Sequence, residues 1–122
     1  IIIDYLKERK LMDKCVEFEK KKDIKYLNEV ISKSLGIGTA NDVIVNSIRN
    51  SLLPNRIVLI TGISKCYGIL RGHTVLNNLH SVVTSNPLVM FYPGSYNGQS
   101  FRLFNIFDND NYYRAFSIVD RK

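Results

Sequence analysis

The 122-residue sequence has no tryptophan, only three prolines and two cysteines, and no long apolar run. A helix that spans a bilayer needs roughly 20 apolar residues, and a secretory signal has its own layout; neither pattern is present. Cys15 and Cys66 lie far apart without paired spacing, which is typical of reduced thiols and not of a disulfide scaffold. We therefore expect a cytoplasmic protein that makes no contact with a membrane.

Acidic residues are scarce in the second half of the chain. Residues 1–60 hold 11 basic and 8 acidic side chains, whereas residues 61–122 hold 6 and 3. The first half therefore has the mixed charge of a solvated helical surface. The second half has a few isolated guanidinium groups among aromatic residues, and such charges usually have a specific partner. The net charge of +6 permits a polyanionic partner without requiring one.

What the chain does contain is ordinary globular composition, with 45% hydrophobic and 23% charged residues. Helical periodicity dominates residues 4–53, where apolar positions recur every three or four residues. The first helix centres on Leu11, Cys15 and Phe18. The expected cap and stop are Asp23 and Gly36 for the second helix, and Thr39 or Asn41 and Pro54 for the third.

The pattern changes to strands in residues 56–119. Residues 56–61 form a β-branched run closed by Gly62, which predicts a strand buried on both faces. A loop to Gly68, a helix over residues 72–83 and a second buried strand over residues 88–92 predict parallel pairing with a crossover helix. Further strands over 101–107 and 112–119, separated by a turn at 108–111, would form a C-terminal hairpin. We predict a single α/β domain, helices first.

Two segments follow the carboxyl ends of the predicted parallel strands, where ligands bind in open α/β sheets. The first is residues 61–74, a glycine-containing loop that leads into a helix start and could hold an anion. Its candidate binding residues are Gly62, Lys65, Arg71, His73 and Thr74. It matches neither phosphate-loop nor dinucleotide fingerprints. The alternative is a tight strand-to-helix turn in which Arg71 pairs with a carboxylate or carbonyl group.

The second segment, residues 92–98, is either a ligand-facing rim or a proline-glycine turn with a flexible tip. The string at 112–116 sets an arginine among aromatic rings, as does the string at 101–104. Such strands could stack nucleic-acid bases, or could simply belong to the core. The remaining candidates for ligand or partner binding are Asn77, Asn78, Tyr92, Gly94, Arg102, Tyr112, Tyr113 and Arg114.

Groups for enzyme chemistry are sparse. His73 and His80 are two helical turns apart, too distant to chelate one ion, and neither cysteine has zinc-site spacing. Between residues 61 and 119 the only acids are Asp108 and Asp110, in the expected turn. We predict no catalytic residues, no metal and no cofactor.

Five strings occur in order in the second half of the chain: LITGI (59–63), LRGHTVLNNL (70–79), FYPGSY (91–96), LF (103–104) and NYYRAF (111–116). Together they resemble the BrxB family, the B component of the bacterial phage-exclusion (BREX) defence systems. The helical stretch from Asp4 to Glu19 also has the family's character. Ser64 and Gly68 depart from the family's pattern, which has a second glycine and a proline there.

This resemblance implies a role within a set of defence proteins. Family members stand beside an ATPase, an alkaline-phosphatase-like protein and a DNA methyltransferase, and have no established catalytic activity of their own. The family also carries an upstream stretch, and this chain opens on Ile1 without a methionine. We therefore expect the C-terminal two-thirds of a longer protein, lacking upstream strands of its sheet.

Three functional hypotheses follow. The leading one is a non-enzymatic assembly module that binds other phage-defence proteins. The second is a subunit of the same system that binds nucleic acid, with DNA as its partner. The third is a nucleotide- or phosphate-binding domain that uses the loop from Gly62 to Gly68 as its cradle.

Overall fold

The computed structural model describes residues 1–108 and 115–119. Four helices come first: α1 (Ile2–Glu8), α2 (Met12–Lys21), α3 (Ile24–Ser34) and α4 (Val43–Ser51). A strand β1 (Val58–Ile60), a 3-10 helix η1 (Ile63–Cys66), the helix α5 (Gly72–His80) and a strand β2 (Leu88–Met90) follow. The described chain then forms β3 (Gly94–Tyr96), β4 (Phe101–Leu103) and β5 (Phe107–Asp108). The predicted α/β class with helices first is confirmed.

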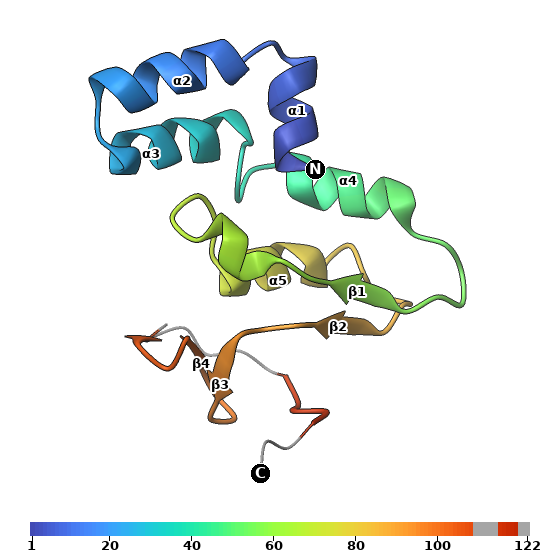
Figure 1. The fold of residues 1–122 in the computed structure, drawn as a ribbon. Helices are drawn as coiled ribbons and strands as arrows, with labels where there is room; N and C mark the ends of the chain where they lie inside the picture. Colours follow the sequence, from blue (N-terminus) through green and yellow to red (C-terminus); the bar gives the residue numbers. More distant parts are fainter. Residues whose placement is uncertain (109–114, 120–122) are drawn as a thin grey trace.

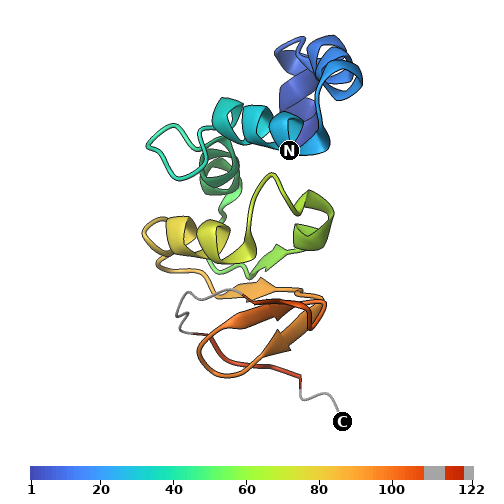
Figure 2. The same ribbon diagram turned by 90° about the vertical axis from the view of Figure 1, so that its left-hand side faces the viewer.

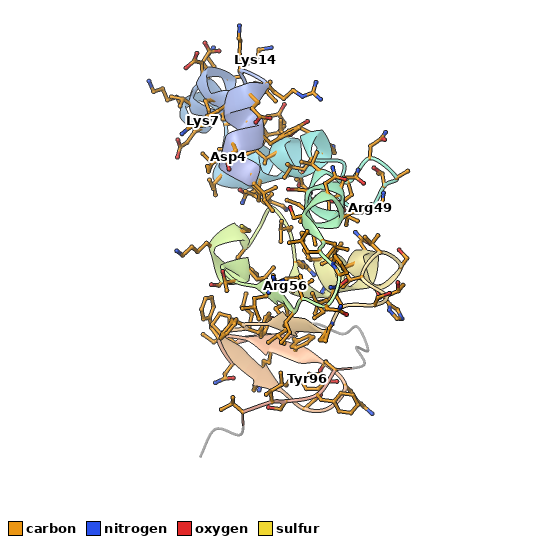
Figure 3. All side chains as sticks on the ribbon, turned by 90° about the vertical axis from the view of Figure 1, so that its right-hand side faces the viewer. Asp4, Lys7, Lys14, Arg49, Arg56 and Tyr96 are labelled. Atoms are coloured by element: carbon orange, nitrogen blue, oxygen red, sulfur yellow. The ribbon has the colours of Figure 1, made fainter. Side chains whose placement is uncertain are left out.

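The molecule is elongated, with α1–α3 at one end and the strands β3 and β4 near the other (Figure 1). The labelled side chains follow the same axis, with Lys7 and Lys14 at the helical end and Tyr96 at the strand end (Figure 3). The charged surface of the helical end is mixed, as expected, since the Lys21 ammonium lies 3.8 Å from a Glu17 carboxylate oxygen.

The helix boundaries follow local capping chemistry. The Asp23 carboxylate accepts a 2.7 Å hydrogen bond from the Tyr26 N–H, as predicted, and Gly36 ends α3 with a φ of +62°. The stretch from Asp4 to Glu19 is not continuous. Lys10 adopts a φ of +54°, and the Leu11 N–H bonds to the Leu6 carbonyl, which is the bond pattern of a helix stop.

The predicted cap of the third helix was wrong by one to three residues. Asp42 caps α4, because its carboxylate accepts hydrogen bonds from the Ile44 and Val45 N–H groups. Thr39 instead bonds within the preceding turn, to the Gly36 carbonyl.

Two hydrophobic cores hold the chain together. The helical core contains Leu6, Leu27, Ile31 and Leu35. The second core joins α4, α5, β1 and β4, and Ile2 and Ile37 pack against both. The buried members of the second core are Ile44, Val45, Ile60, Ile63, Leu70, Val75, Leu76, Leu79 and Phe101.

The predicted parallel pair with a crossover is confirmed, since β1 pairs with β2 in parallel and Leu59 lies opposite Val89. Helix α5 lies on one side of this pair (Figure 2). Ile60 is buried and Met90 packs on the core, but Leu59 is 62% exposed. The expectation of a strand buried on both faces was therefore wrong, because the described helices cover only one face.

The C-terminal strands differ most from expectation. Residues 101–107 are not one strand, since the chain turns at residues 104–106 and β4 pairs antiparallel with β5. The segment 92–98, expected to be either a ligand-facing rim or a proline-glycine turn, contains β3, which pairs antiparallel with β4. Of the strand expected over 112–119, residues 115–119 form no strand and residues 112–114 lie outside the described residues. Of the turn expected at 108–111, only residue 108 is described. The loop to Gly68 contains η1, and α5 ends at His80, before Val83.

Candidate functional site

A cavity of about 260 Å³ lies between the end of α3 and the segment that joins η1 to α5. Two lining residues come from the helical part and the others from the start of the α5 unit. Arg71 supplies the positive charge of this lining, which contains no acidic side chain. The lining residues are Ser32, Ile37, Tyr67, Gly68, Ile69, Leu70, Arg71 and Thr74.

Local structure places these residues. Gly68 adopts a φ of +94°, which only glycine reaches without strain, and this lets the chain turn back after η1. The Ile69 and Leu70 N–H groups both donate to the Cys66 carbonyl, and Leu70 is then buried in the core. Arg71 follows as the extended residue before α5, where it both lines the cavity and is exposed to solvent.

The start of α5 is electrostatically positive. Burial lowers the pKa of His73, and the charge of Arg71 lowers it further. Burial also raises the pKa of the Cys66 thiol, an effect that the positive N-terminal ammonium partly offsets. Both groups are therefore favoured in their neutral forms, and Arg71 is the charge that a ligand in the cavity would meet.

Tyr92 also lies beside the start of α5, where its ring packs against the helix and the core and does not line the cavity. A Cβ atom added to Gly72 would lie 3.2 Å from Cε2 of Tyr92, so the ring packs closely on the α5 backbone. The ring centroid is 4.9 Å from that of Phe101, which is buried. Gly94, predicted with Tyr92, pairs with Leu103 in the β3–β4 ladder.

Asn78 makes a structural contact. Its side-chain amide donates a 3.1 Å hydrogen bond to the Asp42 carboxylate, which is 3% exposed. The same carboxylate oxygen accepts a bond from the Gly38 N–H at 2.9 Å. This network joins α5 to the start of α4.

The structure groups only part of the predicted set. Arg71 and Thr74 share the cavity, and His73 lies next to them on α5. Gly62 and Lys65 are exposed and do not line it. Asn77 and Arg102 are also exposed, whereas Tyr112, Tyr113 and Arg114 lie outside the described residues. Their binding roles remain predictions.

Sequence reasoning missed the contribution of the helical part to the cavity. Ser32 and Ile37 lie more than 30 residues before Thr74 in the chain. The sequence offered no specific signal for this contribution, because an isolated apolar residue such as Ile37 between Gly36 and Gly38 is ordinary on a protein surface.

A second feature is the outward sheet face, formed by Ile57, Leu59, Val89 and Phe91. Side chains alternate along a strand, so these four share the side opposite Val58, Ile60, Leu88 and Met90, which pack on the core. Ile57 and Leu59 are each 62% exposed, and Phe91 is 59% exposed. Parallel sheets normally have both faces covered, so this face has the chemistry of a buried surface.

The described part of the chain offers neither a metal site nor a membrane-spanning helix. Residues 1–108 and 115–119 contain no group of three His, Cys, Asp or Glu side chains placed to hold a metal ion. None of the helices described there is both long and apolar enough to cross a membrane.

Comparison with known proteins gives a consistent result. The family described as BREX protein BrxB matches residues 1–118. A BREX protein BrxB from Bacillus cereus is 40% identical over 121 residues, which cover 99% of this chain and 63% of that protein. A BREX protein BrxB from Escherichia coli is 33% identical over 119 residues, which cover 98% and 58%.

The chain thus spans about three fifths of the length of these relatives. No solved structure matches it. With the family matching almost every residue and the relatives aligning along nearly the whole chain, the protein belongs to the BrxB family.

Proposed function

We propose that this protein acts in a BREX phage-defence system as a non-enzymatic assembly module that binds other defence proteins through its outward sheet face. The carrying observation is the exposure of Ile57, Leu59 and Phe91 on one face of a parallel strand pair. Single apolar side chains on a surface are ordinary, but a contiguous apolar sheet face usually marks an interaction surface.

The chemistry of the face supports a protein partner. Branched and aromatic side chains that are fixed on strands can be covered at little cost in conformational entropy, as at the centre of protein interfaces. The acid–base inventory supports a non-enzymatic role, because residues 61–122 contain only three acidic side chains. The family name printed for the relatives supports the defence context.

The proposal is tested by co-purification. The tagged protein is expressed with the other proteins of its defence island, in wild-type form and as Ile57→Glu. The matched control is Ile24→Glu, since Ile24 is 61% exposed and lies at the start of α3, far from β1 in Figure 1. We expect Ile57→Glu to weaken capture of a defence partner by roughly 30-fold, the loss typical of an interface hot spot of about 2 kcal/mol.

Two results would contradict the proposal. In the first, the wild-type protein captures none of the other defence proteins. In the second, Ile57→Glu captures its partner as well as Ile24→Glu does, which would place the partner on another surface.

A further inference from the structure

We infer that the cavity beside Arg71 binds a small organic anion, a carboxylate or phosphate monoester attached to a single apolar ring or short chain. This inference is independent of the assembly role, because none of the cavity residues belongs to the outward sheet face. It rests on the shape of the cavity, on the charge at its edge and on the mixture of side chains that line it.

The charge selects an anion. Among the described residues, Arg71 has neither an ion pair nor a side-chain hydrogen bond, and the cavity lining contains no acid to neutralise it. A guanidinium group presents paired N–H donors that match the oxygens of a carboxylate or a phosphate. The pKa of His73 is lowered mainly by burial and further by the charge of Arg71, which is consistent with a positive potential at this helix start.

The lining selects the rest of the ligand. Ile37, Ile69 and Leu70 offer an apolar surface, while Ser32 and Thr74 add hydroxyl groups that can donate or accept hydrogen bonds. Ligand pockets commonly combine mostly apolar walls with a few polar groups that fix orientation. The cavity volume of about 260 Å³ is below the roughly 300–1,000 Å³ of drug-sized sites, so it suits one ring and not a dinucleotide.

The structure also relocates the anion site that the sequence suggested. The expected cradle was the whole loop from Gly62 to Gly68, but Gly62 and Lys65 do not line the cavity. The site uses the end of that loop, the start of α5 and the end of α3.

Direct titration calorimetry with three probes tests the inference. Benzoate and phenyl phosphate carry the two anionic groups on the same ring, and benzamide is the neutral counterpart of benzoate. We expect at least one anion to bind at least tenfold more tightly than benzamide. The relative affinities of benzoate and phenyl phosphate then distinguish a carboxylate ligand from a phosphate ligand.

Matched variants locate the binding. Arg71→Gln removes the charge at the cavity, and Arg56→Gln removes an exposed arginine outside its lining. We expect at least a tenfold loss of anion affinity in Arg71→Gln and none in Arg56→Gln. A bound anion should also raise the pKa of His73, measured by NMR titration of the histidine side chains, because it offsets the charge of Arg71.

The inference fails if neither anion binds at concentrations up to about 10 mM, where a ligand with a Kd of about 1 mM would fill most sites. It also fails if benzamide binds as tightly as the tighter-binding of the two anions, or if Arg71→Gln and Arg56→Gln lose affinity equally. Circular dichroism of each variant confirms that it is folded, and the exposure of both arginines makes this the expected result.

Discussion

Replacing Asp42 by alanine should destabilise the protein far more than loss of an ordinary helix cap. The Asp42 side chain is 3% exposed, and its two carboxylate oxygens accept four hydrogen bonds. One oxygen caps α4 at Ile44 and Val45, with distances of 3.0 and 3.1 Å. The other accepts from the Gly38 N–H and the Asn78 amide. The substitution therefore removes a cap and also breaks a link between two helices.

The size of the effect follows from these contacts. Loss of an aspartate cap costs about 1 kcal/mol, with a range of about 0.5–2 kcal/mol. Hydrogen bonds to a charged group contribute about 1.5–3 kcal/mol each, and the two at Gly38 and Asn78 share one oxygen, so they are not additive. We expect Asp42→Ala to lower the free energy of unfolding by about 3–5 kcal/mol, a large part of the roughly 5–15 kcal/mol typical of a domain.

Urea unfolding followed by circular dichroism measures the change. The matched control is Asp23→Ala, because Asp23 also caps a helix but is exposed and accepts one bond, from the Tyr26 N–H at 2.7 Å. This control should cost about 0.5–1 kcal/mol. Asn78→Ala should cost about 1.5–3 kcal/mol alone and less in the Asp42→Ala background, because the two residues share a hydrogen bond.

The reasoning would be refuted if Asp42→Ala cost no more than Asp23→Ala. That result would mean that the bonds from Gly38 and Asn78 add nothing to stability beyond the cap. Strict additivity of Asp42→Ala and Asn78→Ala would likewise show that the two side chains are not coupled.

Two further predictions concern the strands and the start of α5. Gly94→Ala should destabilise the protein by about 1–3 kcal/mol in urea unfolding, because the new Cβ would clash with the Arg102 carbonyl oxygen; the exposed Ser95→Ala should change stability by less than about 0.5 kcal/mol. Equal losses would contradict this. The pKa of His73 in the folded protein lies below its ordinary value of 6.5. As the pH falls, the unfolded chain therefore binds a proton at His73 before the folded protein does. The free energy of unfolding should decrease as the pH drops from 6.5 towards the lowered pKa. Arg71→Gln should raise the His73 pKa and so narrow the pH range over which stability falls, as NMR titration and urea unfolding at several pH values would show. An unchanged His73 pKa would contradict the effect of the Arg71 charge on His73.

Much of the helical half could be predicted because its signals are local. Asp23 and Gly36 are adjacent to the backbone groups that they satisfy, and the spacing of Leu27, Ile31 and Leu35 places them on one helix face. The cap of α4 was misassigned among neighbouring polar residues. Thr39, Asn41 and Asp42 all carry side chains that can cap a helix. Sequence spacing does not show that the Asp42 carboxylate, besides capping α4, is buried and bonded to Asn78.

The strands were harder to predict because burial depends on what packs on them. The run at 56–61 has the composition of a doubly buried strand, yet Leu59 is exposed because the described helices cover only the opposite face. Phe104 and Asn105 form a turn in which both residues adopt positive φ. Because such turns usually contain a glycine and this one has none, the sequence of residues 101–107 did not indicate that the strand is interrupted. At the candidate site, Arg71 and Thr74 could be predicted because they follow the carboxyl end of a parallel strand, where ligands bind in α/β sheets. The contribution of Ser32 to the cavity could not be predicted, because it depends on long-range packing.

The two cores meet through Ile2 and Ile37, which pack against both. Val43 and Ile69 also pack against the helical core. We expect the two cores to form separate cooperative units, which amide hydrogen exchange should resolve as two protection classes. The cavity draws Ser32 and Ile37 from one unit and Arg71 and Thr74 from the other, so it lies along the seam. A ligand bound there would contact both units, and it would raise the free energy of opening the helical unit by an amount that grows with the ligand concentration relative to its Kd.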